Sequence, residues 1–460
     1  MSASDRVPEH RDLASEADRL IVAHLSEVRD YTAAFHASAA ERGLVTIDGP
    51  GWAVRPLFLP AHRLDFVGRA FDAAVRRLVA AVGAHADDAE ALYRAFPFGN
   101  GIADALAVRD GIRAPAALSY FRPDGFLFED RYVLSEINYG NGIVVSTAYT
   151  ELTSEYWRGH PVLRRLGLDH DTHHPRPLQR YIASARRFAR PVETPSVAML
   201  IHSDELATIR EFPERVMRQI DFAFDRFREA GLRPRLVDEA GITLDQRGDP
   251  VFTEDGARID LIQLIAVGVS FLDQPELLKP GGTLEFLRGG RCGSVAILKP
   301  LAGLLLDKGA LPHLCADAGG AGATGADGFA FRVAWSEFPA DRVPGYYEAS
   351  RRDWVIKRSF DGKDTHPGIT RSDAVWRRQV GCAMRGRDYI AQRYISLPKA
   401  RLPVLVDGRH LEQIESRVEL SSFVFDGEIV GSGIRHAPEA EGHVMTDFPE
   451  GYGYTTAYAV

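Results

Sequence analysis

Hydrophobic residues recur every three or four positions in two stretches near the start of the chain, at residues 8–47 and 60–95. This spacing places them on one face of a helix and leaves the charged residues between them on the solvated face. Gly43 marks the end of the first pattern, as glycine often does at a helix terminus. The chain therefore predicts a mostly helical N-terminal lobe over residues 1–115.

The pattern changes to alternation near residue 117, in the aromatic-rich segment ALSYFRPDGFLFEDRYVLSEINYGNG. Alternating hydrophobic and polar residues are typical of strands, and Pro123–Gly125 has the composition of a turn. We predict a two-stranded hairpin within residues 116–150. A helical connection is expected to follow over residues 151–194.

A strand-like run at TPSVAMLIHS, an amphipathic helix at EFPERVMRQIDFAFDRFREAG and a second hydrophobic run at DLIQLIAVGVSF follow one another along the chain. Strand, helix and strand in this order favour a parallel sheet covered by helices. We therefore expect an α/β layer over residues 195–293.

Residues 294–460 contain a strand and helix in VAILKPLAGLLLDKGALPHLC, a Gly/Ala-rich loop at 316–329, and then a series of strands. Asp407–Gly408 and Asp426–Gly427 are expected to form tight turns between antiparallel strands. The predicted fold class is a mixed α/β fold (α+β). The predicted divisions are residues 1–115, 116–150, 151–194, 195–293 and 294–460.

Composition and charge narrow the classes of partner. The net charge is −8 and the basic residues are scattered, so we do not expect nucleic-acid binding. Three widely separated cysteines predict no disulfide framework and fit a reducing compartment. The N-terminal segment is charged, and no apolar stretch approaches 18 residues. We expect a cytoplasmic protein with no membrane partner.

Four polar residues of the predicted hairpin could act together. Arg122 and Asp124 lie on one strand, and Glu136 and Asn138 lie on the next. Residues two apart on a strand point to the same face, so pairing of the strands could gather all four. Two carboxylates and an amide are hard oxygen ligands of the kind that Mg²⁺ binds alongside phosphates and water. On spacing alone, ordinary polar residues on a surface hairpin remain the alternative.

Two lysines and a glutamine suggest a nucleotide site. Lys308 and Lys357 lie within hydrophobic runs, where an ammonium group is costly to bury unless it meets an anion such as a phosphate. Extension of each lysine to the surface is the alternative. Gln392 lies on a hydrophobic strand and could hydrogen-bond an adenine edge, although a plain core strand would have the same pattern.

Other patterns are weaker. Gly320, Gly322 and Gly325 spell G-x-G-x-x-G, but neither a preceding strand nor a following helix supports a dinucleotide site. The Asp/His tract at residues 169–174 is Pro-punctuated and fits a solvated loop better than a metal site. Arg417 and Arg435 lie on late strands and could hold a substrate carboxylate or phosphate, although structural ion pairs are the simpler expectation.

The order of these features resembles the glutathionylspermidine synthase-like group of circularly permuted ATP-grasp ligases. The resemblance rests on Arg122-x-Asp124 followed by Glu136-x-Asn138, and then on Lys308, Lys357 and the strand containing Gln392. It implies a permuted ATP-grasp fold with a pre-ATP-grasp-like α/β layer. RSFDGKDTHPGIT follows Lys357, with fewer glycines than the family's phosphate-covering loop, and the family's amidase segment is absent.

The resemblance also implies roles. Asp124, Glu136 and Asn138 would bind Mg²⁺, Arg122 would stabilise the reaction intermediate, and Lys308, Lys357 and Gln392 would bind ATP. The implied activity is ATP- and Mg²⁺-dependent ligation of a small carboxylate to a small amine through an acyl phosphate, releasing ADP and phosphate. An ATP-dependent small-molecule kinase, a non-catalytic nucleotide-binding protein and a metal-dependent hydrolase remain alternatives. Homo-oligomerisation remains open.

Overall fold

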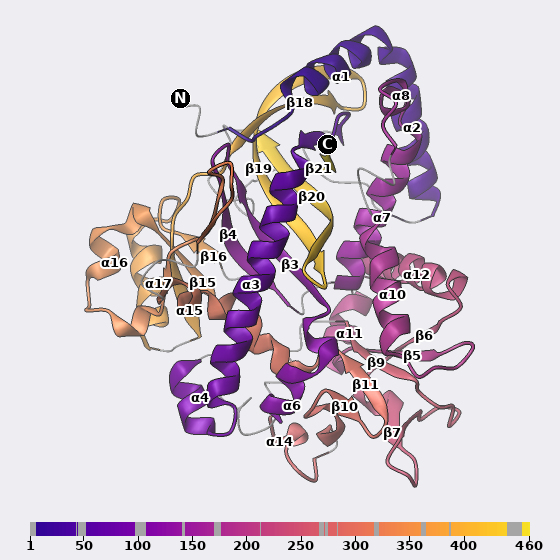
Figure 1. Cartoon of the computed structure of the whole chain (residues 1–460), viewed down its shortest axis with the longest axis vertical. Coiled ribbons are helices and arrows are strands. Elements are labelled where there is room, and N and C mark those ends of the chain that lie inside the picture. The colour runs from indigo at the N-terminus through magenta and orange to yellow at the C-terminus, as the bar shows by residue number, and fades with distance from the viewer. Residues whose placement is uncertain are drawn as a thin grey trace.

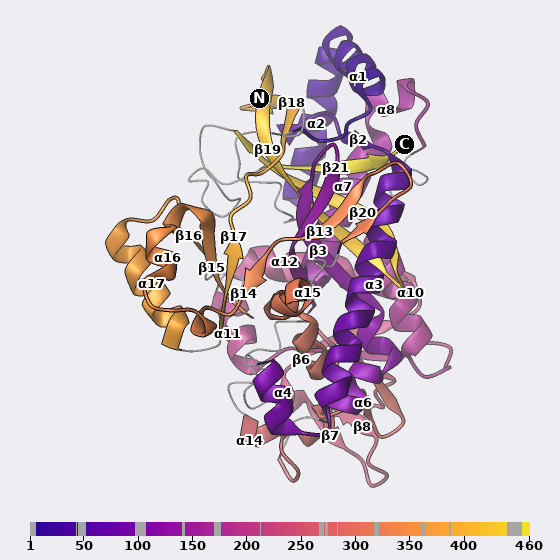
Figure 2. The same cartoon turned by 60° about the vertical axis from the view of Figure 1, so that its left-hand side comes forward.

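The computed structural model describes residues 6–42, 44, 52–96, 107–139, 143–169, 176–211, 213–265, 271, 275–282, 284–316, 322–359, 365–385, 388–438 and 453–460. They form a mixed α/β structure with one large sheet and two smaller layers (Figures 1 and 2). The large sheet extends through the upper and central part of the view in Figure 1. The parallel layer lies below it on the right, and the small sheet lies on the left.

Ten strands form the large sheet, and most neighbours within it are antiparallel. Eight follow the order β12 (Ala323–Thr324), β13 (Ala330–Val333), β4 (Arg131–Asn138), β3 (Tyr120–Leu127), β19 (His410–Phe425), β20 (Glu428–Pro438), β21 (Gly453–Ala459) and β2 (Leu57–Leu59). Off this path, β18 (Lys399–Val406) pairs with β19 and with β1 (Trp52–Ala53). The predicted Asp-Gly turns are confirmed, since Asp426 and Gly427 join β19 to β20 with φ values of 50° and 84°.

The predicted parallel layer is also confirmed. Its five strands follow the order β10 (Arg291–Cys292), β11 (Val295–Leu298), β9 (Leu261–Leu264), β5 (Ser196–Leu200) and β6 (Arg233–Val237). All pairs are parallel except β10–β11. The associated helices are α10 (Pro177–Phe188), α11 (Ser203–Glu211) and α12 (Pro213–Glu229), and a separate hairpin is formed by β7 (Ile242–Leu244) and β8 (Pro250–Phe252).

The small sheet has two chemically different faces. Its order is β14 (Ser336–Glu337), β17 (Tyr389–Arg393), β15 (Trp354–Arg358) and β16 (Thr365–Pro367). On one face Trp354, Ile356 and Ala391 pack against α16 (Tyr346–Ala349) and α17 (Asp373–Arg385). Because successive side chains of a strand point to opposite faces of the sheet, Lys357 and Gln392 lie on the other face.

The remaining helices cover or extend these layers. They are α1 (Arg11–Ala23), α2 (Leu25–Glu41), α3 (Ala61–His85), α4 (Ala89–Ala95), α6 (Val108–Arg113), α7 (Ile143–Gly159), α8 (Pro161–Arg165), α14 (Pro275–Leu278) and α15 (Leu311–Ala316). Short 3₁₀ helices are η3 (Pro115–Leu118), η4 (Glu239–Gly241), η5 (Glu285–Leu287), η6 (Leu301–Leu306), η7 (Lys308–Ala310), η8 (Pro339–Asp341) and η9 (Arg351–Asp353). The expected N-terminal helices are present, but residues 52–59 also supply strands that pair with C-terminal strands.

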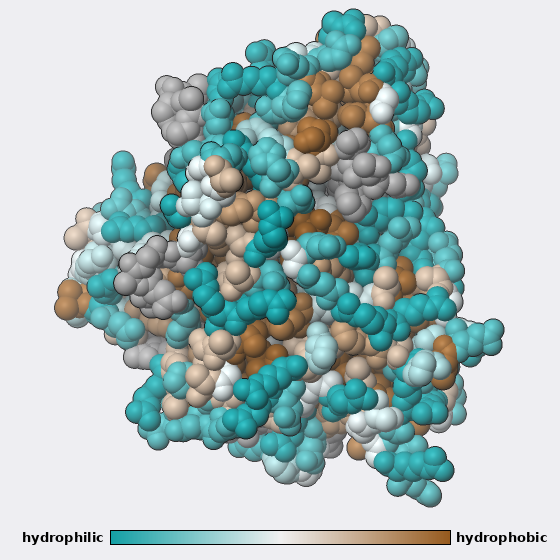
Figure 3. Space-filling model, in the orientation of Figure 1, coloured by the Kyte–Doolittle hydropathy of each residue, from teal (hydrophilic) through white to brown (hydrophobic). Residues whose placement is uncertain are grey.

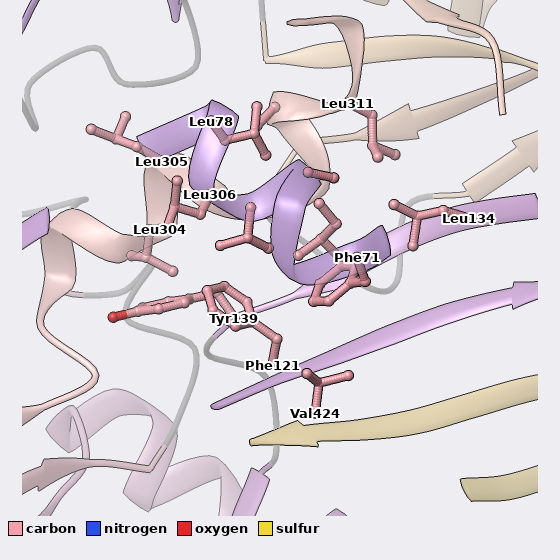
Figure 4. Close-up of a cluster of buried hydrophobic side chains, with 14 of the residues drawn as sticks. Phe71, Leu78, Phe121, Leu134, Tyr139, Leu304, Leu305, Leu306, Leu311 and Val424 are labelled. Atoms are coloured by element: carbon pink, nitrogen blue, oxygen red, sulfur yellow. The ribbon is translucent and has the colours of Figure 1, made fainter. Parts of the chain in front are cut away.

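The largest core lies between α3, the large sheet and the η6 segment (Figure 4). Phe71 of α3 meets Phe121 of β3 edge to face, with 5.8 Å between the ring centroids. All six residues of η6 are buried, including three consecutive leucines, Leu304–Leu306. Full burial of a leucine contributes about 1.5–3 kcal/mol, so this core anchors η6 firmly beside β3 and β4.

The outer surface is predominantly polar on the face seen in Figure 3, where hydrophilic side chains surround smaller hydrophobic patches. Within the described parts of the chain, every helix is too short or too polar to traverse a lipid bilayer.

Three local predictions were wrong. Pro123–Gly125 lies inside β3, and the chain reverses instead at residues 128–130. Lys308 begins the 3₁₀ turn η7 and does not lie within an α-helix, because Asp307 caps that turn through a 2.7 Å bond from the Lys308 amide.

The third wrong prediction concerns residues 316–329. Part of this segment forms the β12–β13 hairpin, whose turn is fixed by Asp327 and by Gly328 at φ 81°. Gly320 and residues 170–174 lie outside the described residues, as do parts of the expected loop at 316–329 and of the segment RSFDGKDTHPGIT after Lys357.

Candidate functional site

The hairpin β3–β4 places its polar residues opposite one another. Arg122 pairs with Asn138, and Asp124 pairs with Glu136. The register then shifts, so that Gly125 faces Leu134 and Ser135 is the extra residue of a bulge. The Ser135 hydroxyl donates to the Asp124 carbonyl at 3.0 Å. The bulge therefore lies directly beside the two carboxylates.

Asp124 is the centre of this polar group. Its side chain is 1 % exposed and accepts hydrogen bonds from Arg122 at 3.2 and 3.3 Å and from the Asn138 amide at 3.0 Å. Arg435 of β20 adds a contact at 3.3 Å. Arg122 also donates to the Ser146 hydroxyl at the start of α7. A buried carboxylate is thus surrounded by two guanidinium groups and an amide, which stabilise its charge.

Glu136 faces a lysine from a distant segment. The Lys308 ammonium, whose side chain is 1 % exposed, lies 3.4 Å from the Glu136 carboxylate. Burial alone would raise the pKa of Glu136, but the charges of Lys308 and Lys357, with smaller effects from two arginines, lower it to about 2. Glu136 is therefore ionised at neutral pH and acts as an anion in this cluster.

Asp307 connects this lysine to the hairpin. One carboxylate oxygen accepts the Lys308 amide at 2.7 Å, and the other accepts the Tyr139 amide at 3.2 Å. Tyr139 directly follows Asn138 at the end of β4. Burial raises the pKa of Asp307 to about 6, although Lys308 and the two backbone donors oppose that rise.

The small sheet contributes the other two predicted nucleotide residues. Lys357 and Gln392 both donate to the carbonyl of Ser135, at 3.5 and 3.0 Å. Burial, followed by repulsion from Lys308, lowers the pKa of Lys357, and Glu136 is the main opposing charge. The bulged carbonyl is therefore one of the points where the small sheet contacts the large sheet.

All seven predicted site residues are connected by these contacts. Arg122, Asp124 and Asn138 contact one another, Glu136 joins them through strand pairing and contacts Lys308, and the Ser135 carbonyl links β4 to Lys357 and Gln392. Their roles remain predictions.

Two further residues belong to the cluster. Glu419 of β19 lies opposite Arg435, and their side chains are 2.8 Å apart. Burial raises the pKa of Glu419 to about 7, with Asp124 adding to the rise and Arg435 opposing it. The predicted ion pairing of Arg435 is confirmed by its contacts with Asp124 and Glu419. Arg417, the other arginine considered, donates to the Ser396 hydroxyl at 3.1 Å. Glu419 was missed because Glu412 and Glu415 on the same strand look equivalent in sequence.

The donor chemistry of Asp124, Glu136 and Asn138 fits a hard cation. Within the described part of the chain, no group of three or more His, Cys, Asp or Glu side chains is arranged to hold a metal ion. The predicted set contains two carboxylates, and its third member, Asn138, directs its NH₂ group at Asp124. Rotation of that amide would present its oxygen instead, which completes the oxygen set that Mg²⁺ prefers.

The cluster gathers cations where they could meet an anionic ligand. Four cations, Arg122, Lys308, Lys357 and Arg435, lie among four carboxylates, Asp124, Glu136, Asp307 and Glu419. Buried cations of this kind can neutralise phosphoryl oxygens far more effectively than cations in water.

Comparison with known proteins adds little to this geometry. No family model matches the chain, and no curated protein matches it. Among solved structures, one that covers 82% of this chain and 87% of its own is titled "Putative gamma-glutamylcysteine synthetase", from Methylobacillus flagellatus KT. Its TM-score is 0.41 at 10% identity, and a similarity this low carries no argument about fold or function. The family inferred from the sequence therefore remains a prediction.

Proposed function

We propose that this chain is an ATP- and Mg²⁺-dependent ligase that joins a carboxylate to an amine. One observation supports this above all. The bulged β3–β4 hairpin places Asp124 and Glu136 opposite each other. Lysines from two distant segments contact β4 at neighbouring residues, Lys308 at the Glu136 carboxylate and Lys357 at the Ser135 carbonyl. Oxygen ligands and convergent cations are what a Mg²⁺–triphosphate complex requires.

In this proposal the residues position and neutralise charge. Lys308 and Lys357 hold phosphate oxygens, and Gln392 hydrogen-bonds the adenine. Asp124, Glu136 and Asn138 hold Mg²⁺, which supplies charge neutralisation at the phosphates when it is bound. Arg122 lies 2.9 Å from Ser146 and within reach of Asp124, so it can stabilise negative charge that develops on the reacting groups.

The proposed reaction has two displacements. A carboxylate oxygen of the acid attacks the γ-phosphorus of ATP, and ADP leaves. The amine nitrogen then attacks the carbonyl carbon of the acyl phosphate, phosphate leaves with one oxygen of the acid, and the nitrogen loses a proton. Catalysis of this kind depends mainly on orientation and on charge stabilisation.

The test uses acids labelled with ¹⁸O in the carboxylate. Panels of amino acids and amines are screened for ADP release, and the phosphate formed is analysed by mass spectrometry. Transfer of one ¹⁸O from acid to phosphate is expected. A stable phosphorylated product without free phosphate would instead identify the kinase, and activity without nucleotide would identify the hydrolase.

Matched variants assign the reaction to the cluster. Asp124→Asn and Glu136→Gln are expected to lower the rate of ADP release at least about 100-fold, since each removes a charge that the proposed metal requires. Asp130→Asn is the matched control, because Asp130 is an exposed carboxylate in the turn of the same hairpin and forms an ion pair with its neighbour Arg131. This variant should retain activity.

A further inference from the structure

Lys299 is a buried lysine outside the predicted site. It follows β11 directly, its residue is 2 % exposed, and its backbone adopts the left-handed conformation at φ 61°. L-residues other than Asn and Asp rarely adopt this conformation, which costs roughly 1–2 kcal/mol. Burying an ammonium group costs several kcal/mol more unless the group is compensated. Two unfavourable features at one residue persist only where the surrounding structure compensates for them.

The compensation comes from β3 and from the residue that follows β4. The Lys299 ammonium donates to the backbone carbonyl of Tyr120 in β3. It also lies 4.8 Å from the Tyr120 ring centroid, 4.7 Å from that of Phe121 and 3.9 Å from that of Tyr139. Aromatic faces attract cations within about 6 Å, so three rings together stabilise the ammonium in place of water.

These rings belong to the residues that flank the charged cluster. Tyr120 and Phe121 immediately precede Arg122, and Tyr139 immediately follows Asn138. Figure 4 shows Tyr139 beside Phe121 and close to the leucines of η6, and the two rings are 5.6 Å apart. A displacement of the rings would therefore displace the first and last polar residues of the hairpin.

The segment after Lys299 returns to the same tyrosine. The Tyr139 hydroxyl donates to the Pro300 carbonyl at 3.1 Å, and a Cβ atom on Gly303 would overlap the Tyr139 ring. Asp307 then accepts the Tyr139 amide and caps the turn that begins with Lys308. Residues 299–308 thus enclose Tyr139 and end at the cation that faces Glu136.

We propose that Lys299 is a positioning residue, whose buried ammonium ties the start of β3 and the end of β4 to the 299–308 segment and thereby sets the spacing between Lys308 and the hairpin carboxylates. The inference rests on the proposed function for its effect on nucleotide binding. Burial lowers the pKa of Lys299 well below that of an exposed lysine, and the charge of Asp307 opposes this.

The experiment compares Lys299→Met, which keeps the length and removes the charge, with Lys299→Arg, which keeps a cation. Amide hydrogen exchange of residues 120–127 and 131–139 is measured without nucleotide, and ATP binding is measured by calorimetry with Mg²⁺. Lys299→Met is expected to accelerate exchange in both strands and to raise the Kd for ATP about tenfold. Lys299→Arg should restore the Kd to within about threefold of the wild-type value.

Two controls separate positioning from general stability. Lys279→Met removes an exposed lysine and should change neither measurement. Val82→Ala removes methyl groups from fully buried Val82 of α3, and should lower the melting temperature without changing the Kd.

Unchanged exchange in β3 and β4 of Lys299→Met would overturn the proposal, as would a melting temperature lowered with no change in Kd. Wild-type protein that fails to bind ATP would contradict the proposed function, while the exchange comparison would still decide whether Lys299 positions the hairpin.

Discussion

At the scale of single residues, Asp124, Glu136 and Glu419 each lie beside a cation from another segment of the chain. Asp124 is paired with Arg122 and Arg435, and Glu136 is paired with Lys308. Each charge is costly to bury alone, so the pairs depend on one another. Loss of one member of a pair therefore removes the contact and also leaves the charge of its partner buried without compensation.

Lys308→Met tests this dependence directly. The change removes the nearest cation of Glu136 and a proposed phosphate ligand, so the Kd for ATP should rise at least about tenfold, which corresponds to about 1.4 kcal/mol. Calorimetric titration with ATP and Mg²⁺ measures it. Lys399→Met, on the partly exposed start of β18, is the matched change and should leave the Kd within about twofold. Equal affinity of both variants for ATP would show that Lys308 does not contribute to ATP binding.

The residue types of the site could be predicted from sequence, whereas two of its partners could not. Strand alternation places Glu136 and Asn138 on one face of their strand, whereas the register that brings Asp124 opposite Glu136 came from the structure. Glu419 and Lys299 owe their importance to burial by strands and rings far away in the chain. Nothing in the residues adjacent to them distinguishes them from other glutamates and lysines.

At the scale of elements, the feature that matters most is the bulge in the β3–β4 hairpin. It adds Ser135 to one strand and turns its carbonyl toward Lys357 and Gln392. Composition suggested a turn at Pro123–Gly125, but both residues lie within β3, on the strand that faces the bulge. Local composition could not distinguish a turn from a bulged strand, because glycine and proline occur in both.

Gly125→Ala tests the close packing at this bulge. A Cβ atom on Gly125 would press against the Tyr132 ring and the Val133 carbonyl, so we expect a loss of about 1–3 kcal/mol in the free energy of unfolding. Urea denaturation measures this difference. Gly433→Ala adds the same methyl group to β20, where no atom lies within 4 Å, and should change stability by less than about 0.5 kcal/mol. Similar values for the two variants would contradict the predicted crowding.

At the scale of the whole molecule, order along the chain and order in space differ strongly. β3 pairs with β19, and β2 pairs with β21, although each pair joins opposite ends of the sequence. Hydrophobic periodicity reports only local structure, so it predicted the strands at β3 and β19 but not their pairing, and it missed β2 within the expected helical lobe. The predicted domain boundaries remain predictions for the same reason.

The pH dependence of stability is a property of the whole fold. Burial lowers the pKa of His436 in β20 to about 4, while an unfolded histidine titrates near pH 6.5. Between these values the unfolded chain binds more protons at this residue. The contribution of His436 to stability is therefore complete above about pH 6.5 and is lost as the pH drops toward 4, by up to about 3 kcal/mol. Glu419 and Asp307, whose pKa values are raised, contribute in the opposite direction.

Urea denaturation at several pH values measures the effect. His436→Gln should flatten the loss between pH 6.5 and 4, whereas the exposed His62 should not affect it when replaced in the same way. His160 and His313 are also buried and have lowered pKa values, so part of the slope should persist. An identical slope in wild type and His436→Gln would contradict the assignment.

The pairing of β3 with β19 has a consequence for synthesis. The hairpin that carries Asp124 leaves the ribosome about 300 residues before its neighbour in the sheet is translated. At roughly 5–20 residues per second, one edge of that hairpin waits for about 15–60 seconds without its partner strand. A newly made chain can thus complete the charged cluster only after β19 and β20 have been translated.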